Sequence, residues 1–152
     1  MNGKISVSLI VPAYKEEEFI EETLKNYLQI FTESKIDFEI ITVIDKVYDD
    51  KTDEIVKKIA KNSKEISFVI REGKKGIGSA IKEGIKKAQK DTILIATAEI
   101  SEDPHDLLKM VEKMNLGNYI KFLGSIANKK IPQKLNEAQI FINLSNFNPS
   151  WY

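Results

Sequence analysis

The sequence predicts an α/β protein, a three-layer sandwich in which helices cover both faces of a mainly parallel sheet. Apolar, β-branched runs alternate along the chain with segments of helical periodicity, a pattern typical of parallel strands joined by right-handed crossovers. With 152 residues, the chain is long enough for one domain with a substantial core. Apolar residues make up 42% and charged residues 30% of the chain, the balance of a soluble globular protein.

Six strands are expected where β-branched and apolar residues cluster: Ile5–Val11, Phe38–Ile44, Ile66–Ile70, Thr92–Thr97, Tyr119–Leu123 and Ile140–Leu144. Pro12 has no N–H for a sheet ladder, so the first strand is expected to end there. The glutamates at positions 16–18 then open a helix, because carboxylates favour the positive end of the helix dipole.

Helices are expected where apolar residues recur at spacings of three and four: Glu17–Ser34, Thr52–Asn62, Ser79–Gln89, a helix that begins at Pro104, and Pro132–Ala138. Residues 1–114 are interpreted as the core of the domain. Residues 115–152 are interpreted as a strand-helix-strand tail that completes the same domain.

The composition excludes several classes of function. Basic and acidic residues number 23 each, so no net charge draws the chain to nucleic acid or to anionic lipid. The absence of cysteine excludes disulfides, thiolate chemistry and Cys-ligated zinc, and the single histidine, His105, excludes multi-histidine metal sites. The sequence contains no secretion signal and no run of transmembrane length. We expect a cytoplasmic protein, peripheral at the inner membrane face at most.

Three polar loops follow expected strands, at residues 12–16, 44–52 and 97–104. If the first, second and fourth strands are neighbours, these loops form one crevice at the carboxyl edge of the sheet, where open α/β sheets bind ligands. Carboxylates there suit a Mg²⁺ or Mn²⁺ ion that bridges a diphosphate, since these cations prefer oxygen ligands. The alternative is that the acidic loops only cap the helices that follow them.

A fourth loop, Gly73-Lys-Lys-Gly-Ile-Gly-Ser79, precedes the third helix. Glycines let a backbone approach a ligand, helix N-termini favour anions, and Lys74 and Lys75 add positive charge. The loop matches neither a Walker loop nor the G-x-G-x-x-G pattern. It is therefore either a phosphate-binding turn or a plain turn before an amphipathic helix.

These four loops resemble, in order and spacing, the motifs of family 2 glycosyltransferases. Residues 10–17, Ile-Val-Pro-Ala-Tyr-Lys-Glu-Glu, are similar to the family's I-V-P-A-Y-N-E-E, and residues 39–52 to its E-I-I-V-V-D-D-G-S-T-D-G-T. Residues 75–80 are similar to G-K-G-A-A. Residues 93–108 resemble the I-V-M-D-A-D-L-S-H-D-P-E-D-L of dolichyl-phosphate mannose synthases. The similarity covers about residues 5–114.

The resemblance implies a GT-A nucleotide-diphospho-sugar domain with a Rossmann-like sheet. It implies transfer of a hexose, with inversion, from a UDP- or GDP-linked sugar to a polyprenyl phosphate or glycan acceptor. Glu99 then holds Mg²⁺ or Mn²⁺, with help from Ser101 or Asp103, and Asp50 shapes the second loop. The nucleotide-binding positions carried over from the motifs are Pro12, Ala13, Tyr14, Glu16, Asp45, Lys75, Gly76, Thr97 and Ala98.

Three positions depart from the family pattern. Lys15 replaces an Asn, and Lys46 replaces the second Asp of the D-D pair. Thr97 replaces the first Asp of D-x-D, so only one carboxylate of that motif remains. The alternatives are therefore a catalytically inactive nucleotide-sugar-binding or partner-binding module, or an interaction subunit whose partner supplies the acceptor site. No catalytic base is assigned.

The tail resembles two different segments. Lys121–Ile126 is similar to the strand V-V-I-G-S-R of the mannose synthases. Together with residues 131–145, the same stretch also resembles part of family 4 glycosyltransferases, where V-K-F-L-G-x-V is followed by a helix and A-D-V-F-V-x-P-S. The tail is assigned no catalytic role. A membrane protein or a second copy of the chain are the alternatives for a protein partner.

Overall fold

The computed structural model describes residues 5–73, 76–99, 105–106 and 108–109. Strands and helices alternate along them as predicted: β1 (Ser6–Ala13), α1 (Ile20–Glu33), β2 (Asp37–Asp45), α2 (Thr52–Ala60), β3 (Ile66–Arg71), α3 (Ile77–Lys87) and β4 (Thr92–Ile95). Among these helices, none has both the length and the apolar character needed to cross a bilayer.

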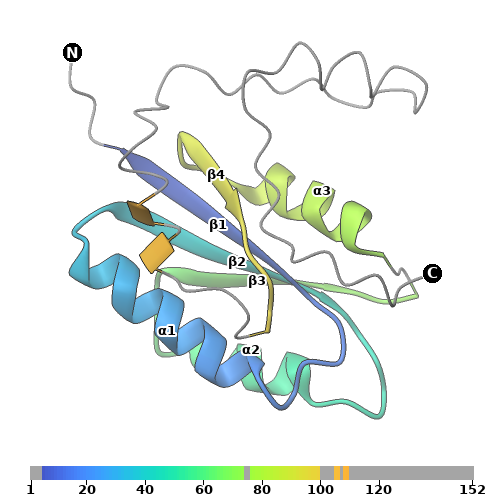
Figure 1. Cartoon of the computed structure of the whole chain (residues 1–152). Coiled ribbons are helices and arrows are strands. Elements are labelled where there is room, and N and C mark those ends of the chain that lie inside the picture. The colour runs from blue at the N-terminus through green and yellow to red at the C-terminus, as the bar shows by residue number, and fades with distance from the viewer. Residues whose placement is uncertain (1–4, 74–75, 100–104, 107, 110–152) are drawn as a thin grey trace, which may run out of the picture.

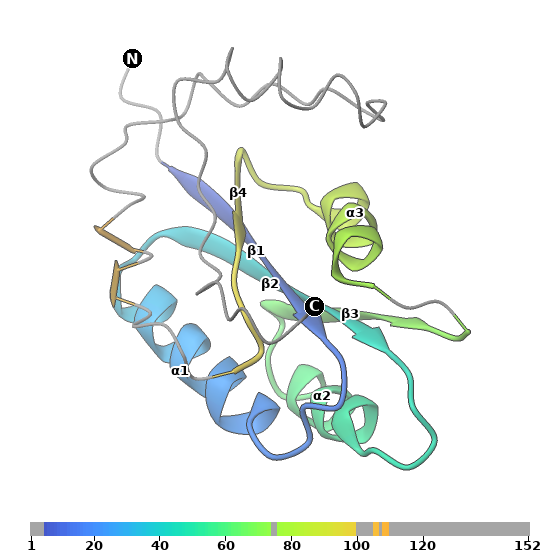
Figure 2. The same cartoon turned by 45° about the vertical axis from the view of Figure 1, so that its right-hand side comes forward.

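The four strands form one parallel sheet in the order β3-β2-β1-β4. Figures 1 and 2 show α1 and α2 on one face of this sheet and α3 on the other. The predicted α/β sandwich with a parallel sheet is therefore confirmed for the described residues. The order also makes β1 the neighbour of both β2 and β4, which was the condition for a shared crevice.

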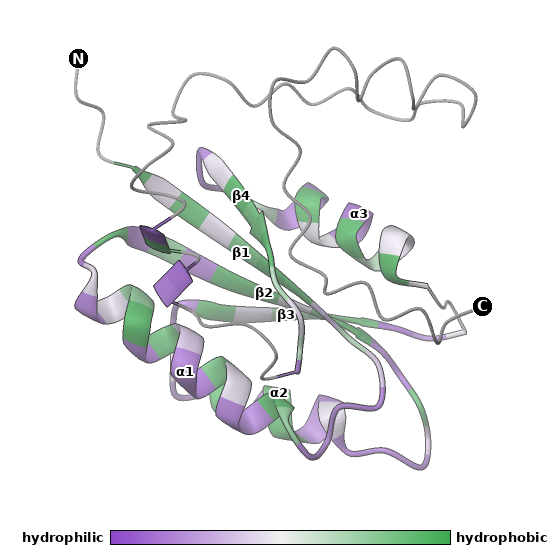
Figure 3. Ribbon diagram, in the orientation of Figure 1, coloured by the Kyte–Doolittle hydropathy of each residue, from purple (hydrophilic) through white to green (hydrophobic). Residues whose placement is uncertain are grey.

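Each face of the sheet carries its own hydrophobic cluster, because successive side chains of a strand point to opposite faces. The larger cluster packs alternate residues of β1 beneath α1 and α2; its fully buried members include Val7, Leu9, Val11, Ile20, Leu24, Phe31, Ile40 and Val56. The smaller cluster joins Ile10, Ile41 and Val43 to Ala80 of α3. Figure 3 shows the resulting pattern, with hydrophobic strands inside and hydrophilic residues on the outer sides of the helices.

The predicted end of the first strand, Val11, is wrong by two residues. Pro12 pairs with Val43, and β1 continues to Ala13. Neighbouring residues of a parallel strand direct their N–H groups to opposite neighbours, so Pro12 faces the same side as Ile10, whose carbonyl oxygen accepts the Ala96 N–H from beyond β4. The β4 ladder ends at Ile10, so the missing N–H of Pro12 leaves no ladder bond unmade.

The predicted start of the first helix is also wrong. The glutamates at positions 16–18 form a turn, in which the Glu16 carbonyl accepts the N–H groups of Phe19 (3.1 Å) and Ile20 (2.9 Å), and α1 begins only at Ile20. Residues 21 and 22, both glutamates, occupy the first helical turn. Elsewhere β4 ends two residues earlier and α3 begins two residues earlier than predicted.

Beyond these boundaries, residues 105, 106, 108 and 109 are helical, in line with the helix expected after Pro104. Pro104 itself, the strands predicted at Tyr119–Leu123 and Ile140–Leu144, and the helix predicted at Pro132–Ala138 lie outside the described residues.

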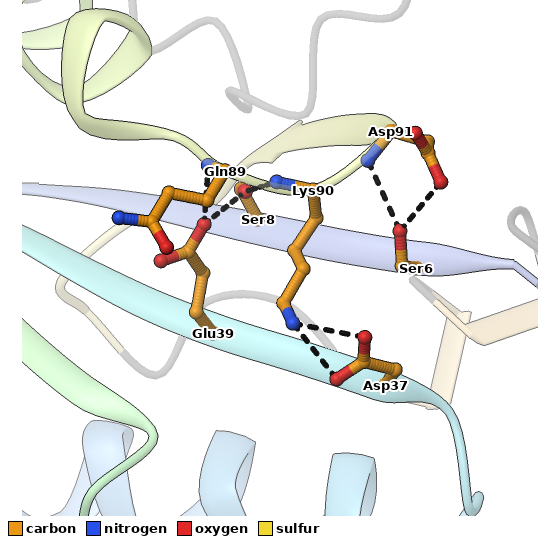
Figure 4. Close-up of polar contacts among 7 residues, drawn as sticks. All are labelled: Ser6, Ser8, Asp37, Glu39, Gln89, Lys90 and Asp91. Atoms are coloured by element: carbon orange, nitrogen blue, oxygen red, sulfur yellow. Dashed lines mark hydrogen bonds and ion pairs between the residues drawn. The ribbon is translucent and has the colours of Figure 1, made fainter.

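A polar network fixes the connection from α3 to β4 at the amino edge of the sheet (Figure 4). Ser8 donates its hydroxyl to Glu39 (2.6 Å) and accepts the Lys90 N–H (3.1 Å). Ser6 makes the equivalent pair of bonds with the side chain and N–H of Asp91, at 2.8 and 3.1 Å. Both serines are buried in β1, so their hydroxyls set where the chain re-enters the sheet.

α3 approaches β1 closely at Gly84. A Cβ atom on Gly84 would lie 2.5 Å from Cγ2 of Ile10, a fully buried side chain. Gly84→Ala is therefore expected to lower the free energy of unfolding by roughly 1–3 kcal/mol through overpacking. Gly78→Ala in the same helix meets nothing within 4 Å and is expected to raise it by roughly 0.5–1 kcal/mol. Urea denaturation of both variants measures the difference, and equal effects would contradict the close contact.

Candidate functional site

The loops that follow β1, β2 and β4 leave the sheet at the same edge, because these three strands are parallel neighbours. Figure 3 shows hydrophilic residues along the loops that follow β1 and β2. Of the predicted site residues on these loops, Ala13, Asp45 and Ala98 are buried, whereas Tyr14 and Glu99 are exposed. This edge of the sheet therefore contains both buried residues and exposed side chains.

One carboxylate from each loop contributes to a common negative potential. Burial, followed by the charges of Glu99 and Asp50, together raise the pKa of Glu16 from 4.5 to about 7. These residues stand 83 and 34 positions apart from Glu16 in the chain, so only the fold brings their charges together. The arrangement repels anions at this point and favours a cation.

The first and second loops are tied together at the start of α2. Glu16 donates its N–H to the Thr52 hydroxyl (2.9 Å), and Lys51 donates its N–H to the Glu17 carboxylate (2.9 Å). Asp50 accepts the Thr52 N–H (3.0 Å), which gives Asp50 the loop-shaping role that the resemblance implies. Loop 12–16 and loop 44–52 are therefore joined by hydrogen bonds at the N-terminal turn of α2.

Lys15 adopts a left-handed backbone conformation, with φ of 58°. Asn tolerates this region better than most residues, which explains the Asn of the family motif at this position in conformational terms. The Lys15 side chain forms an exposed ion pair with Asp49 (3.7 Å), a contact between the two loops that contributes little to stability in water. Lys46 forms a separate ion pair with Asp53, at 3.6 Å.

The second loop is tied to the glycine-rich loop by a buried ion pair. Arg71, at the end of β3, donates Nε to Asp45 (2.6 Å) and also binds the same carboxylate through Nη2. The second oxygen of Asp45 accepts the Gly76 N–H (3.0 Å). Arg71 further donates to the Ser79 hydroxyl (2.7 Å) and to the Gly76 carbonyl (3.2 Å). Asp45 thus positions the start of α3, in addition to the nucleotide contact predicted for it.

Gly76 needs to be glycine. Its φ is +116°, a conformation that residues with a Cβ rarely adopt, and it directly precedes α3. The predicted phosphate-binding turn therefore has a distorted backbone at the N-terminus of an 11-residue helix. Lys74 and Lys75 lie outside the described residues.

The third loop contains the Thr97-Ala-Glu99 remnant of D-x-D. Thr97 donates its hydroxyl to the Glu99 carbonyl (3.1 Å), which closes a short turn. Within the described residues, no group of three His, Asp or Glu side chains is arranged to hold a metal ion. Ser101 and Asp103, the predicted helpers of Glu99, lie outside those residues. Among the described residues of this motif, Glu99 offers one carboxylate, and a cation here would need further oxygen ligands.

Two residues of this network were not predicted as site residues. Arg71 is the only arginine among 23 basic residues and stands directly at the end of a strand, and a guanidinium is the cationic group that suits a buried ion pair. Thr52 follows Asp50 at a helix start, which is a usual place for a side chain that bonds backbone N–H groups. Neither feature of the sequence identifies the bonding partner, because Asp45 lies 26 residues from Arg71 and Glu16 lies 36 residues from Thr52.

The sequence model of the family described as Glycosyl transferase family 2 matches residues 8–150. The chain belongs to this family. The match includes the tail, whose similarity to family 4 stays a prediction. Glycosyltransferase AglD of Haloferax volcanii is 29% identical over 124 residues, 80% of this chain and 20% of that protein. Dolichol-phosphate mannosyltransferase of Pyrococcus furiosus is 29% identical over 119 residues, 76% of this chain and 32% of that protein.

The fold of this family 2 chain also matches solved structures. Glucosyl-3-phosphoglycerate synthase from Mycobacterium tuberculosis, in complex with Mn²⁺, UDP-glucose and phosphoglyceric acid, superposes with a TM-score of 0.59 at 18% identity. The superposition covers 75% of this chain and 41% of that one, and it shows a GT-A type fold. The chain spans between 20% and 36% of the length of the curated relatives it matches.

Glu16→Gln tests the shared negative potential. The raised pKa means that Glu16 binds more protons in the folded than in the unfolded state between pH 4.5 and about 7, so its contribution lowers stability as pH rises through this window and levels off above it. Gln keeps the shape without the charge and should flatten this decline. It should raise the free energy of unfolding at pH 8 by on the order of 1 kcal/mol, allowing for solvent screening of a half-buried group. Urea denaturation from pH 4 to 8 measures both, and exposed Glu18→Gln, which should keep the wild-type slope, is the control.

Arg71→Met tests the buried ion pair. Loss of the guanidinium leaves Asp45 as an unpaired charge that is 5% exposed, so the free energy of unfolding should fall by about 3–5 kcal/mol. The double variant Asp45→Asn/Arg71→Met removes both charges and should recover part of this loss. Denaturation at pH 7 compares them; a double variant no more stable than Arg71→Met would rule out the pair as the cause.

Proposed function

We propose that this protein is a glycosyltransferase that transfers a hexose from a UDP- or GDP-linked sugar to a polyprenyl phosphate or glycan acceptor. The observation that carries the proposal is the convergence, at one sheet edge, of four loops that resemble motifs of the family to which the chain belongs. With a polyprenyl phosphate as acceptor, the protein would work at the inner face of a membrane.

The proposed donor site divides into three parts. Pro12, Ala13, Tyr14 and Glu16 of the first loop, with Asp45 of the second, bind the nucleoside. The Gly76 turn, with Lys75 and the N–H groups that begin α3, binds the diphosphate, since helix N-termini favour anions. The third loop contains Thr97, Ala98 and the metal ligand Glu99.

A divalent cation, Mg²⁺ or Mn²⁺, suits the third part on electrostatic grounds. The charges of Glu99 and Asp50 help to raise the pKa of Glu16 at this edge, and a bound cation would relieve that repulsion. Glu99 is exposed and able to reach a ligand, and diphosphate oxygens complete the coordination. When the ion is bound, the charge that develops on the leaving diphosphate is neutralised. An acceptor phosphate is already anionic and attacks the anomeric carbon without a general base.

A second function, nucleotide-sugar binding without turnover, is favoured by one observation. Thr97 stands where the family motif has the first Asp of D-x-D, and its hydroxyl, which donates to the Glu99 carbonyl, is a neutral oxygen and a weaker cation ligand than a carboxylate. One protein carboxylate holds a cation more weakly than two. By resemblance, turnover in the family depends on both carboxylate positions of the D-x-D motif.

Isothermal titration with UDP-glucose and GDP-mannose, each with Mn²⁺ and with EDTA, tests both functions. We expect one nucleotide to bind more tightly with Mn²⁺ and Glu99→Gln to remove about tenfold of that gain, while Glu22→Gln on the exposed side of α1 leaves it unchanged. Release of the nucleoside diphosphate in the presence of a short polyprenyl phosphate then separates enzyme from binding module. No binding of any nucleotide would contradict both functions.

A further inference from the structure

The strand that leads to Glu99 leaves the sheet before it reaches the site. The β1–β4 ladder ends at Ile10 and Ile95, and the last backbone bond is from the Ala96 N–H to the Ile10 carbonyl (3.0 Å). Ala96 and Ala98 are nevertheless 2% and 3% exposed. Buried carbonyl groups in this segment therefore need hydrogen-bond donors from outside the sheet.

Two side chains of α1 supply those donors. Thr23 donates its hydroxyl to the Ala98 carbonyl (2.9 Å), and Tyr27 donates its hydroxyl to the Thr97 carbonyl (3.3 Å). The two residues are one helical turn apart on the buried face of the helix and are 2% and 1% exposed. The Thr97 hydroxyl donates to the Glu99 carbonyl. The carbonyl groups of Thr97, Ala98 and Glu99 therefore each accept a hydrogen bond from a side-chain hydroxyl.

The same helix also begins at the first loop. The Glu16 carbonyl accepts the Ile20 N–H at the start of α1, and Thr23 lies within the first helical turn. One rigid element therefore sets the spacing between Glu16 and the loop of Glu99. The charge of Glu99 on Glu16 agrees with this fixed spacing.

We propose that Thr23 and Tyr27 are positioning residues that hold the Glu99 loop in the geometry required for cation-dependent nucleotide binding. The proposal rests on the proposed donor site and goes beyond it, because it assigns the cation-dependent part of binding to side chains that touch neither nucleotide nor metal. Loss of the Thr23 hydroxyl removes a donor from the buried Ala98 carbonyl, and loss of the Tyr27 hydroxyl removes one from the partly buried Thr97 carbonyl. In either variant the loop is expected to shift toward water and to take Glu99 with it.

Thr23→Val removes the hydroxyl with little change of shape, and Thr23→Ser restores a hydroxyl. Thr42→Val is the matched control, because Thr42 of β2 is also fully buried but its hydroxyl has no hydrogen-bond partner within the described part of the chain. The readout is the ratio of affinities for the preferred nucleotide sugar in Mn²⁺ and in EDTA, with free Mn²⁺ followed by electron paramagnetic resonance. Thr23→Val should lower this ratio by about tenfold, Thr23→Ser should recover most of it, and Thr42→Val should leave it unchanged.

Tyr27→Phe should lower the ratio by roughly two- to fivefold, since its hydrogen bond is longer, and it decides the question if Thr23→Val does not fold. Equal losses in Mn²⁺ and in EDTA, or no loss in folded variants, would overturn the proposal. Wild-type binding that Mn²⁺ does not strengthen would also overturn it while leaving a nucleotide site in place. Failure of the wild type to bind any nucleotide sugar would instead refute the proposed function.

Discussion

The ion pair of Asp45 and Arg71 joins the ends of two strands to the start of a helix, and the carboxyl edge of the sheet depends on it. Both side chains are 5% exposed, so each charge requires the other. Through Gly76 and Ser79 the pair also fixes where α3 begins. The pair therefore stabilises the Gly76 backbone at a φ of +116°, beside the site.

Much of the fold could be predicted from the sequence because its signals are local. The period of apolar residues located each strand and helix of residues 5–99, and the polar loops between them fell at one edge once the strands alternated with helices. The errors were at boundaries. Pro12 was expected to end a strand, but whether a missing N–H matters depends on which neighbour it faces. The glutamates at positions 16–18 suited a helix start, but the turn was closed by the Glu16 carbonyl instead.

The site could be predicted in outline only. Glu16, Asp45 and Glu99 were singled out because polar residues at strand ends and a family resemblance both pointed to them. Arg71, Thr52 and Thr23 were missed because each acts on a partner between 26 and 75 residues away, and no periodicity encodes such a partner. A buried hydroxyl and a surface hydroxyl look alike in a sequence, so these bonds are known only from the fold.

The anchors of the candidate site belong to different layers of the molecule. The Glu99 loop is attached to α1 on one face of the sheet, whereas the Gly76 turn begins α3 on the other (Figure 2). The sheet separates the two helical layers, so a change in the packing of one layer affects one half of the site first. Under the proposed function, cation affinity and diphosphate affinity would therefore be separable, and repacking α1 would alter the first while leaving the second as it was.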